Sequence, residues 1–289
     1  MQMQIKKPVD TSDRSIGAVL IDSGRLSIED VEPILHLQKA ANLRFGDAAI
    51  ELGLLKQEDI QYALARQFDY PYLIKGESRV SSDLVAAYQP FSSQVESLRA
   101  LRSQLMLRWF TGEAGHKAMT IVSPMRGEGR SYLAANLAIL FSQLGEQTLL
   151  IDGDMRNPRQ DKLFHLKSRI GLSDILAGRS SHLDVIEPIS SFANLSVLPS
   201  GTLPPNPQEL LGRRHFGELL EELGREFDVI LIDTPAGMES TDAQTVSICA
   251  GAGLLVARKH HSQINALRSF ANSFAYSTVE LVGTVVNEY

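Results

Sequence analysis

The chain has 289 residues, of which 44% are hydrophobic and 21% are charged, and its net charge is -6. This composition is that of an ordinary globular protein with room for two domains and a sizeable core. The negative charge argues against a nucleic-acid-binding protein, which would normally show a basic face. The first ten residues, MQMQIKKPVD, lack the apolar segment of a signal peptide, and no apolar run approaches the roughly 18 residues of a membrane span. We expect a cytoplasmic protein that binds neither DNA nor RNA.

The front of the chain contains a duplicated unit. Residues 15–38 (SIGAVLIDSGRLSIEDVEPILHLQ) and 44–67 (RFGDAAIELGLLKQEDIQYALARQ) align without gaps, and the spacer KAANL separates them. In each copy a short apolar helix is predicted to end at a glycine (Gly24 or Gly53), and an amphipathic helix with acidic residues near its start follows. The pattern predicts a small all-helical domain of two tandem helix pairs over residues 15–67, after an N-terminal tail of residues 1–14.

The two motifs and their five-residue spacer resemble the N-terminal domain of MshE-like and type II secretion ATPases, which binds cyclic di-GMP. The resemblance implies ligand contacts at Gly17, Leu20, Leu35 and Gln38 in the first copy, where the adjacent Arg14 could reach the ligand, and at Arg44, Gly46, Leu64 and Gln67 in the second. Two residues depart from the family pattern: Ser15 replaces the first motif arginine, and Ala49 replaces a leucine. Serine cannot stack on a guanine or pair with phosphate as arginine does. A helical docking module that has lost the ligand is therefore the alternative function of this domain.

Residues 68–92 contain two prolines, a glycine and several serines, a composition that predicts a linker. The next run, SSQVESLRALRSQLMLRWF, predicts an amphipathic helix in which Glu96, Arg99 and Arg102 share one face. A solvated charged face and a contact between subunits are both compatible with this spacing.

From residue 118 onward, short apolar runs alternate with helical segments. The predicted strands lie at residues 118–122, 147–152, 194–199, 228–233, 253–258 and 281–287. Nearly continuous apolar strands separated by helices indicate an α/β fold, with a parallel sheet covered by helices on both faces. Ligands of such sheets bind at the carboxyl ends of the strands.

The stretch SPMRGEGRSYLAANLA follows the first of these strands and has the form of a phosphate-binding loop of the P-loop NTPase type. Its glycines let backbone N–H groups approach phosphate oxygens, and the helix that follows presents its positive N-terminus. We expect a nucleotide-binding loop with ligand contacts at Gly127, Glu128, Gly129, Arg130, Ser131 and Tyr132. The hydroxyl of Ser131 is placed to bind Mg²⁺.

Acidic residues stand at the ends of two further strands. Asp152 and Asp154 occur in LLIDGDMRNP, and Asp233 occurs in VILIDTPAG. Carboxylates at strand ends downstream of a glycine-rich loop are typical of a nucleotide–Mg²⁺ site. We expect Ser131, Asp154 and Asp233 to hold Mg²⁺ and Arg130 to offset phosphate charge.

Together with LPPNPQELL (203–211) and VGTVVN (282–287), these motifs make residues 90–289 resemble the bacterial tyrosine kinases of polysaccharide export, which are relatives of the MinD and ParA ATPases. The resemblance implies a kinase domain over residues 93–289 with ATP and Mg²⁺ as cofactors, Asp152 as the base toward a tyrosine hydroxyl and Asn287 as an adenine contact. It also implies a homo-oligomer that packs through Glu96, Arg99 and Arg102. A membrane chain-length-determinant protein (a co-polymerase) would be the partner that recruits the chain to the inner face of the cytoplasmic membrane. We therefore expect an ATP-dependent protein-tyrosine kinase that regulates exopolysaccharide polymerisation and export and responds to cyclic di-GMP.

Three residues of the loop and the end of the chain depart from these patterns. Arg130 replaces the loop lysine, and a planar guanidinium is not equivalent to an ammonium group; Tyr132 replaces a threonine. The chain ends in VVNEY, so Tyr289 is the single candidate phosphoacceptor where the kinases carry a tyrosine cluster. A catalytically impaired nucleotide-binding switch is therefore one alternative function. A MinD/ParA-like ATPase is another, although Met125 stands where those proteins carry a signature lysine.

Overall fold

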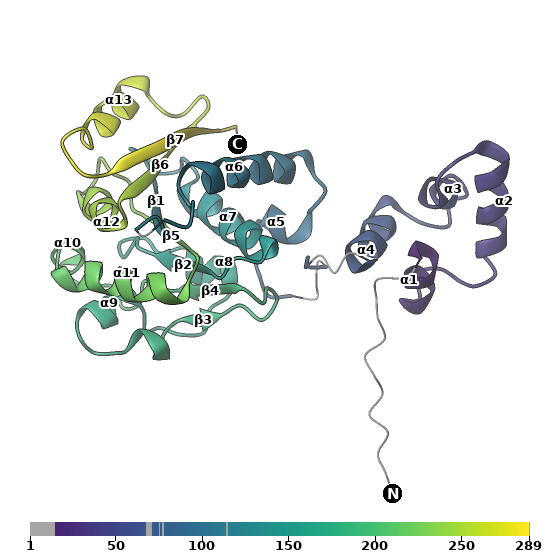
Figure 1. Ribbon diagram of the computed structural model, residues 1–289, viewed down its shortest axis with the longest axis horizontal. Coiled ribbons are helices and arrows are strands. Elements are labelled where there is room, and N and C mark those ends of the chain that lie inside the picture. The colour runs from purple at the N-terminus through teal and green to yellow at the C-terminus, as the bar shows by residue number, and fades with distance from the viewer. Residues whose placement is uncertain (1–14, 68–70, 75, 77, 114, 289) are drawn as a thin grey trace, which may run out of the picture. The chain divides into compact units, whose positions relative to one another are not determined.

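The computed structural model describes residues 15–67, 71–74, 76, 78–113 and 115–288. The chain divides into two compact units, Met1–Pro71 and Tyr72–Tyr289, and each is described by itself (Figure 1). The predicted N-terminal tail, the predicted ligand contact Arg14 and the candidate phosphoacceptor Tyr289 lie outside the described residues.

Among its described residues, the N-terminal unit contains two helices in each copy of the repeat. They are α1 (Ile16–Asp22), α2 (Val31–Ala41), α3 (Phe45–Glu51) and α4 (Gln57–Gln67). Gly24 and Gly53 follow the first helix of each copy with positive φ angles of 70° and 69°. Glycine is the residue that adopts this conformation without strain, and it therefore ends the helix in both copies.

The helices of this unit pair mainly between the copies. α1 packs against α4, and α2 packs against α3, around one apolar core that includes Leu20, Ile34 and Ile60. Gly46 serves this packing, because a Cβ atom there would lie only 3.1 Å from Cγ2 of Ile60. Since each copy covers the apolar face of the other, the two copies form one folding unit.

Within its described residues, the second unit is built on a seven-stranded sheet of order β3-β4-β2-β5-β1-β6-β7. The strands are β1 (Ala118–Val122), β2 (Thr148–Asp152), β3 (Glu187–Pro188), β4 (Leu195–Leu198), β5 (Val229–Asp233), β6 (Ala252–Arg258) and β7 (Glu280–Asn287). Every neighbouring pair is parallel except β3 and β4. The six predicted strands are confirmed. The short antiparallel β3 was not predicted, because Glu187–Pro188 offers no apolar run.

Helices cover both faces of this sheet (Figure 1). They are α5 (Val85–Tyr88), α6 (Ser93–Arg108), α7 (Arg130–Leu144), α8 (Gln160–Phe164), α9 (Leu172–Leu176), α10 (Pro207–Leu211), α11 (Arg214–Glu226), α12 (Asp242–Ala250) and α13 (Ile264–Asn272). One buried cluster connects helices α5, α6 and α7 to the sheet. A second buried cluster connects the four helices α9, α10, α11 and α12 to it. The predicted α/β fold is thus confirmed. In the part of the chain that is described, none of the helices is both long enough and apolar enough to cross a membrane.

Residues 79–92 differ from the linker that the sequence predicts. Leu84, Ala86 and Ala87 are fully buried in the cluster that contains α7, and the backbone N–H of Ala86 donates to Oδ1 of Asn136 at 2.9 Å. Ser82 and Pro90 of this segment lie in turns, but its apolar residues cover α7. The segment therefore belongs to the α/β unit, which begins before the predicted residue 93.

Candidate nucleotide-binding site

The glycine-rich loop joins β1 to α7, where the sequence places it. Gly127 and Gly129 have positive φ angles of 74° and 100°, which other residues adopt only with strain. A Cβ atom on Gly129 would also overlap the side chain of Asn287. Because α7 begins at Arg130, the loop ends at a helix N-terminus, whose free backbone N–H groups favour an anion such as phosphate.

The buried side chain of Glu128 stabilises the conformation of the loop. Its side chain is fully buried and accepts hydrogen bonds from the backbone N–H of Met125, at 2.7 Å, and from the hydroxyl of Ser262. Asn287, the predicted adenine contact, donates from Nδ2 to the Glu128 carbonyl at 3.1 Å. The Glu128 carboxylate therefore contacts protein groups, whereas Asn287 lies beside the loop at the end of β7.

Asp152 and Asp233 are register partners at the carboxyl ends of neighbouring strands β2 and β5, and both are fully buried. Burial raises the pKa of the Asp152 carboxyl well above its usual range, and the charge of Asp233 raises it further. The carboxylate of Asp152 accepts three backbone N–H groups: Arg159 and Gln160 donate to Oδ2 at 2.9 Å each, and Asp154 donates to Oδ1 at 3.2 Å. Asp152 therefore organises the chain that follows β2.

Burial also raises the pKa of Asp233, to about 6. The nearby Ser131 hydroxyl, the Gln160 amide that donates to Oδ2 and the charge of Arg130 act in the opposite direction. Three of the predicted site residues (Ser131, Arg130 and Asp233) are thus brought together, and Gln160 joins them.

Gln160 is a buried residue of the site that sequence reasoning missed. It is fully buried, and its Nε2 donates to Oδ2 of Asp233 at 2.8 Å and to the carbonyl of Ser131 at 3.2 Å. The signal in the sequence is only its place eight residues after Asp152, inside the run IDGDMRNPRQ. Nothing in that run distinguishes Gln160 from a surface glutamine.

The side chain of Arg130 is almost completely buried, with 8% of the residue exposed. Its Nε donates to the carbonyl of Thr234 at 2.9 Å, and its Nη1 donates to the carbonyl of Met125, at 2.6 Å, and to the hydroxyl of Ser123. Burial lowers the pKa of the guanidinium, while the charges of Asp233 and Asp154 raise it. Arginine stays protonated in proteins, so Arg130 is a buried cation that connects the loop to the residue after Asp233.

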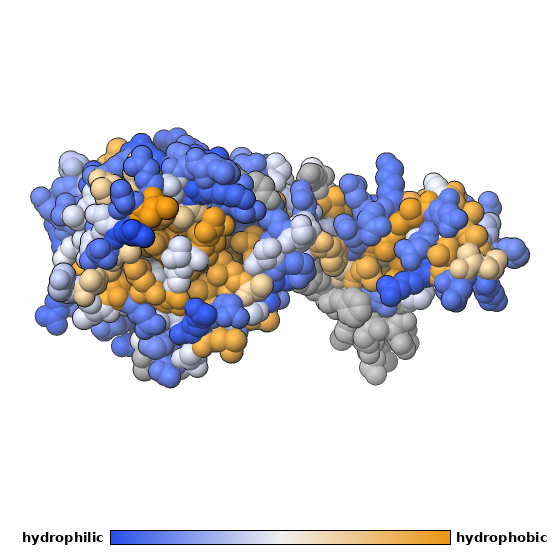
Figure 2. Space-filling model, turned by 90° about the horizontal axis from the view of Figure 1, so that it is seen from above, coloured by the Kyte–Doolittle hydropathy of each residue, from blue (hydrophilic) through white to orange (hydrophobic). Residues whose placement is uncertain are grey.

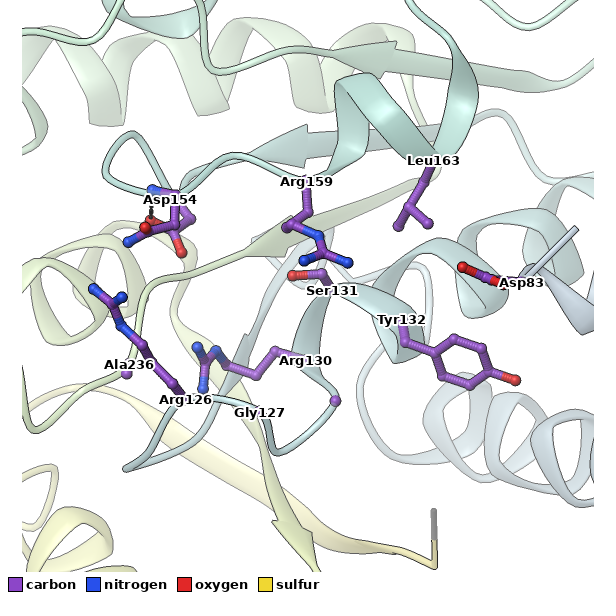
Figure 3. Close-up of a pocket in the computed structure, with 12 residues that line it drawn as sticks. Asp83, Arg126, Gly127, Arg130, Ser131, Tyr132, Asp154, Arg159, Leu163 and Ala236 are labelled. Atoms are coloured by element: carbon purple, nitrogen blue, oxygen red, sulfur yellow. Dashed lines mark hydrogen bonds between the residues drawn. The ribbon is translucent and has the colours of Figure 1, made fainter. Parts of the chain in front are cut away.

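A cavity of about 390 Å³ opens beside the loop (Figure 3). Its lining combines loop residues with residues that follow β2: Gly127, Gly129, Arg130, Ser131, Asp154, Asn157 and Arg159. Tyr132 points away from the loop toward Asp83 (Figure 3), and its hydroxyl accepts a hydrogen bond from Nε2 of Gln94 at 2.8 Å. Of the three acids predicted at the strand ends (Asp152, Asp154 and Asp233), Asp154 is the one that lines the cavity, and Asp83 is a further acid in the lining.

The residues present fit a nucleotide with its magnesium ion. Among the described residues, Oδ1 of Asp233 and Oε1 of Gln160 are buried without a hydrogen-bond partner, and such acceptors suit a hydrated cation. The described residues contain no group of three or more His, Cys, Asp or Glu side chains arranged to hold a metal alone. The predicted ligands Ser131, Asp154 and Asp233 would therefore share Mg²⁺ with phosphate oxygens and water.

Arg156 connects the Asp154 loop to the start of α12. Its Nε donates to Oδ2 of Asp242 at 2.8 Å and its Nη2 to Oδ1 at 3.3 Å. The Asp242 side chain is 1% exposed and that of Arg156 is 37% exposed. The pair therefore neutralises a buried carboxylate.

Replacing Arg156 with methionine is expected to lower the free energy of unfolding of the α/β unit by about 2 kcal/mol, because Asp242 would stay buried without its partner. The loss is smaller than for a fully buried pair, since water reaches the arginine. Trp109, the only tryptophan of the chain, is buried in this unit, so its fluorescence during urea unfolding measures the change. Methionine at the exposed Arg225 is the control, and an equal effect of both substitutions would contradict the prediction.

The predicted subunit-contact residues lie on α6. Arg99 pairs with Glu96, whose side chain is 62% exposed, and Nη1 of Arg102 donates to the carbonyl of Leu140 at 2.8 Å. Arg102 thus helps to attach α6 to α7. The contact between subunits stays a prediction.

The predicted cyclic di-GMP contacts divide into core and surface positions. Leu20 is fully buried, Leu64 packs against the core, and a Cβ atom on Gly17 would lie 3.3 Å from the Phe45 ring; Gly46 also serves the core. The surface set is Leu35, Gln38, Arg44 and Gln67, of which Leu35 and Arg44 are exposed and the two glutamines are half-buried. Among the predicted contacts that the structure describes, only Leu35 and Arg44 are exposed, while Leu64 is half-buried like the two glutamines.

No family model matches the chain, but curated proteins and solved structures do. The tyrosine-protein kinase YwqD of Bacillus subtilis is 32% identical over 210 residues, which are 73% of this chain and 87% of YwqD. The putative tyrosine-protein kinase CapB of Staphylococcus aureus is 32% identical over 207 residues, 72% of this chain and 90% of CapB. The tyrosine-protein kinase wzc of Salmonella typhimurium is 35% identical over 215 residues, 74% of this chain, which spans only 30% of wzc.

Solved structures show the same relationship. The chimerical protein CapA2B2 superposes with a TM-score of 0.67 at 32% identity, over 81% of this chain and 99% of the chimera. The kinase domain of the Escherichia coli tyrosine kinase ETK superposes with a TM-score of 0.69 at 28% identity, over 74% and 82% of the two chains. The septum site-determining protein MinD of Pyrococcus horikoshii, complexed with Mg-ADP, superposes with a TM-score of 0.53 at 25% identity, over 60% and 70%. The chain belongs to the bacterial tyrosine-protein kinase family, whose fold is related to that of MinD.

Proposed function

We propose that the α/β unit is an ATP-dependent protein-tyrosine kinase. The observation that carries the proposal is the convergence of the glycine-rich loop, the Ser131 hydroxyl and the Asp154 carboxylate on one cavity. The names of YwqD and wzc as tyrosine-protein kinases support the reaction, and the Mg-ADP of the MinD structure supports ATP and Mg²⁺ as cofactors. When bound, Mg²⁺ would neutralise phosphate charge.

Each part of the cavity has a proposed role. The backbone N–H groups at Gly127 and Gly129 hold the phosphates, while Ser131, Asp154 and Asp233 hold the metal ion. The sequence assigns the base to Asp152, but its carboxylate is fully buried and already accepts three N–H groups. We assign Asp152 to shaping the loop that carries Asp154. The Asp154 carboxylate lines the cavity, and its Oδ1 accepts the backbone N–H groups of Arg156 and Asn157. Its Oδ2 is therefore the oxygen that we assign to the metal ion and the acceptor hydroxyl.

A nucleotide-binding switch is the second candidate function, and the contacts of Arg130 favour it. Three of the five N–H donors of the guanidinium bond Ser123, Met125 and Thr234, so protein groups rather than phosphate fix its position. A switch would bind nucleotide and assemble without transferring phosphate. A MinD/ParA-like ATPase is less well supported, because Met125 replaces the signature lysine.

The setting proposed for either function is exopolysaccharide polymerisation and export, on a homo-oligomer recruited by a membrane chain-length-determinant protein. The similarity to a chimera whose name combines CapA with CapB supports a separate partner protein. The test is radiolabelled ATP with the full chain, Mg²⁺ and the cytoplasmic segment of the partner. Labelled tyrosine supports the kinase. Nucleotide binding without labelling supports the switch, and rapid hydrolysis without labelling supports the ATPase.

We also propose that the N-terminal unit binds cyclic di-GMP. Arg44 is exposed directly before α3, and Gln38 and Gln67 lie near the ends of α2 and α4. The apolar surface of this unit (Figure 2) would suit a docking module equally well; its exposed apolar residues include Ile28, Leu35, Leu52 and Leu54.

Alanine at Arg44 is expected to weaken cyclic di-GMP binding at least tenfold, because a guanidinium that stacks on guanine and pairs with phosphate is worth about 1.4 kcal/mol or more. Calorimetry with the full chain measures the change. Alanine at the exposed Lys56 removes an equal charge from the same unit and should leave the affinity within about threefold. No heat at high ligand concentration with the native chain would leave the docking function.

A further inference from the structure

Gln160 contacts all three segments that build the acidic end of the site. Its backbone N–H donates to Oδ2 of Asp152 at 2.9 Å. Its side-chain Nε2 donates to Oδ2 of Asp233 at 2.8 Å and to the backbone carbonyl of Ser131 at 3.2 Å. One residue thus connects the ends of β2 and β5 to the first turn of α7.

The orientation of the Gln160 amide follows from these contacts. Nε2 carries two hydrogens, and two acceptors face it; a reversed amide would place Oε1 against the Asp233 carboxylate and the Ser131 carbonyl. Oε1 must therefore point elsewhere. It is buried and has no hydrogen-bond partner among the described residues, and the same holds for Oδ1 of Asp233.

Two such acceptors in contacting side chains are unusual, because a buried polar group without a partner is costly. Their position also matters, since Ser131 and Asp233 are the proposed holders of the metal ion. A metal-bound water is a strong donor that would satisfy both oxygens. The amide is moreover neutral, so it offers an acceptor without adding a further negative charge beside Asp152 and Asp233.

The chain around Gln160 is rigid enough to aim the side chain. Gln160 is the first residue of α8, and Leu163 and Phe164 of the same helix are buried in the core cluster of the sheet. The Leu163 carbonyl accepts the backbone N–H of Ser81 at 2.8 Å. Such support from packed neighbours is what keeps a positioning group in one geometry.

We propose that Gln160 is a positioning residue of the magnesium site. Nε2 fixes the Asp233 carboxylate against the end of the loop, and Oε1 accepts a hydrogen bond from water in the shell of the ion. This inference rests on the proposed nucleotide–Mg²⁺ site and adds to it a residue in the second layer around the ion.

The test is calorimetry of the full chain with ADP, in EDTA and in Mg²⁺. The measured quantity is the factor by which Mg²⁺ increases the affinity for ADP. Gln160→Met keeps the size of the side chain but removes both its donor and its acceptor, and we expect this factor to fall about tenfold. The affinity in EDTA should stay within about threefold of the native value, because Gln160 is not proposed to touch phosphate.

Gln160→Glu separates positioning from a merely structural role. It adds a negative charge beside Asp233, which weakens ADP binding in EDTA and attracts the divalent ion, so the Mg²⁺ factor should rise. A residue that only filled space would lose affinity in both conditions and in both variants. Circular dichroism confirms that each variant is folded.

Gln147→Met is the matched control, because Gln147 is exposed directly before β2, at the opposite end of that strand from Asp152. It should leave the Mg²⁺ factor unchanged. A native-like factor in Gln160→Met, or a fall in Gln160→Glu equal to that in Gln160→Met, overturns this inference while leaving the nucleotide site in place. No binding of ADP by the native chain in either condition overturns the proposed function and this inference together.

Discussion

Replacing Arg130 with lysine is expected to increase tyrosine phosphoryl transfer by about 100-fold, because a small misplacement of the group that contacts the transferred phosphate costs a factor of this size. The native guanidinium bonds three protein groups: the hydroxyl of Ser123 and the carbonyls of Met125 and Thr234. A lysine ammonium is compact, lacks the planar fork and cannot hold the same three acceptors at once. The lysine ammonium is therefore free to contact the transferred phosphate.

The measurement is the rate of tyrosine labelling from radiolabelled ATP, with the partner's cytoplasmic segment present at a saturating concentration. Lysine at the exposed Arg268 of α13 is the control for a change from arginine to lysine elsewhere in the unit, and its rate should equal that of the native chain. Equal or slower labelling by the Arg130 variant would show that the arginine is adapted to transfer. The kinase would then work with a guanidinium in the loop.

The glycine loop and the strand-end acids could be predicted from the sequence because each depends on local pattern. An apolar run that ends in aspartate places that aspartate at the carboxyl edge of a parallel sheet, whatever the rest of the chain does. Asp152 and Asp233 accordingly meet as register partners. Asp152 and Asp233 are fully buried, whereas Asp154 lines the cavity. This difference could not be predicted, because it depends on how the chain after β2 folds back over Asp152.

The contacts of Arg130 and Gln160 depend on residues far away in the chain. Arg130 bonds a carbonyl 104 positions away, and Gln160 bonds a carboxylate 73 positions away. A substitution in a motif reveals that the chemistry has changed, as at Arg130, but not which acceptors lie within reach. Gln160 stands in no motif, and its role becomes visible only when the buried hydrogen-bonding groups are counted.

Tertiary packing also decided the two features of the fold that differ from simple expectation. Residues 79–92 have the composition of a linker, yet Leu84 and Ala87 are buried against the sheet unit. The repeat predicts two helix pairs, and its helices pair mainly across the copies. In both cases the apolar residues were visible in the sequence, but the surface that covers them was not.

Replacing Asp233 with asparagine is expected to stabilise the chain at pH 7.5 in the absence of Mg²⁺. Burial raises the pKa of Asp233 from its usual value of 3.8 to about 6. The unfolded chain therefore releases this proton at a lower pH than the folded chain, and stability falls as the pH rises from about 4 through 6. Above pH 6 the buried charge costs up to about 3 kcal/mol, at 1.4 kcal/mol for each unit of pKa. Asparagine has nearly the same shape and removes that cost.

The urea midpoint, followed by Trp109 fluorescence in EDTA, measures the gain at pH 7.5 and at pH 4.5. The gain should be largest at pH 7.5 and should shrink at pH 4.5, where the folded native chain keeps the Asp233 proton. Asparagine at the exposed Asp184 is the control and should change the midpoint little at either pH. A loss of stability at pH 7.5, or a gain that does not depend on pH, would mean that Arg130 and the hydrogen bonds to Asp233 already compensate its charge. If the gain is found, the empty site is less stable because it keeps a carboxylate ready for a cation, and Mg²⁺ with nucleotide should stabilise the native chain far more than the asparagine variant.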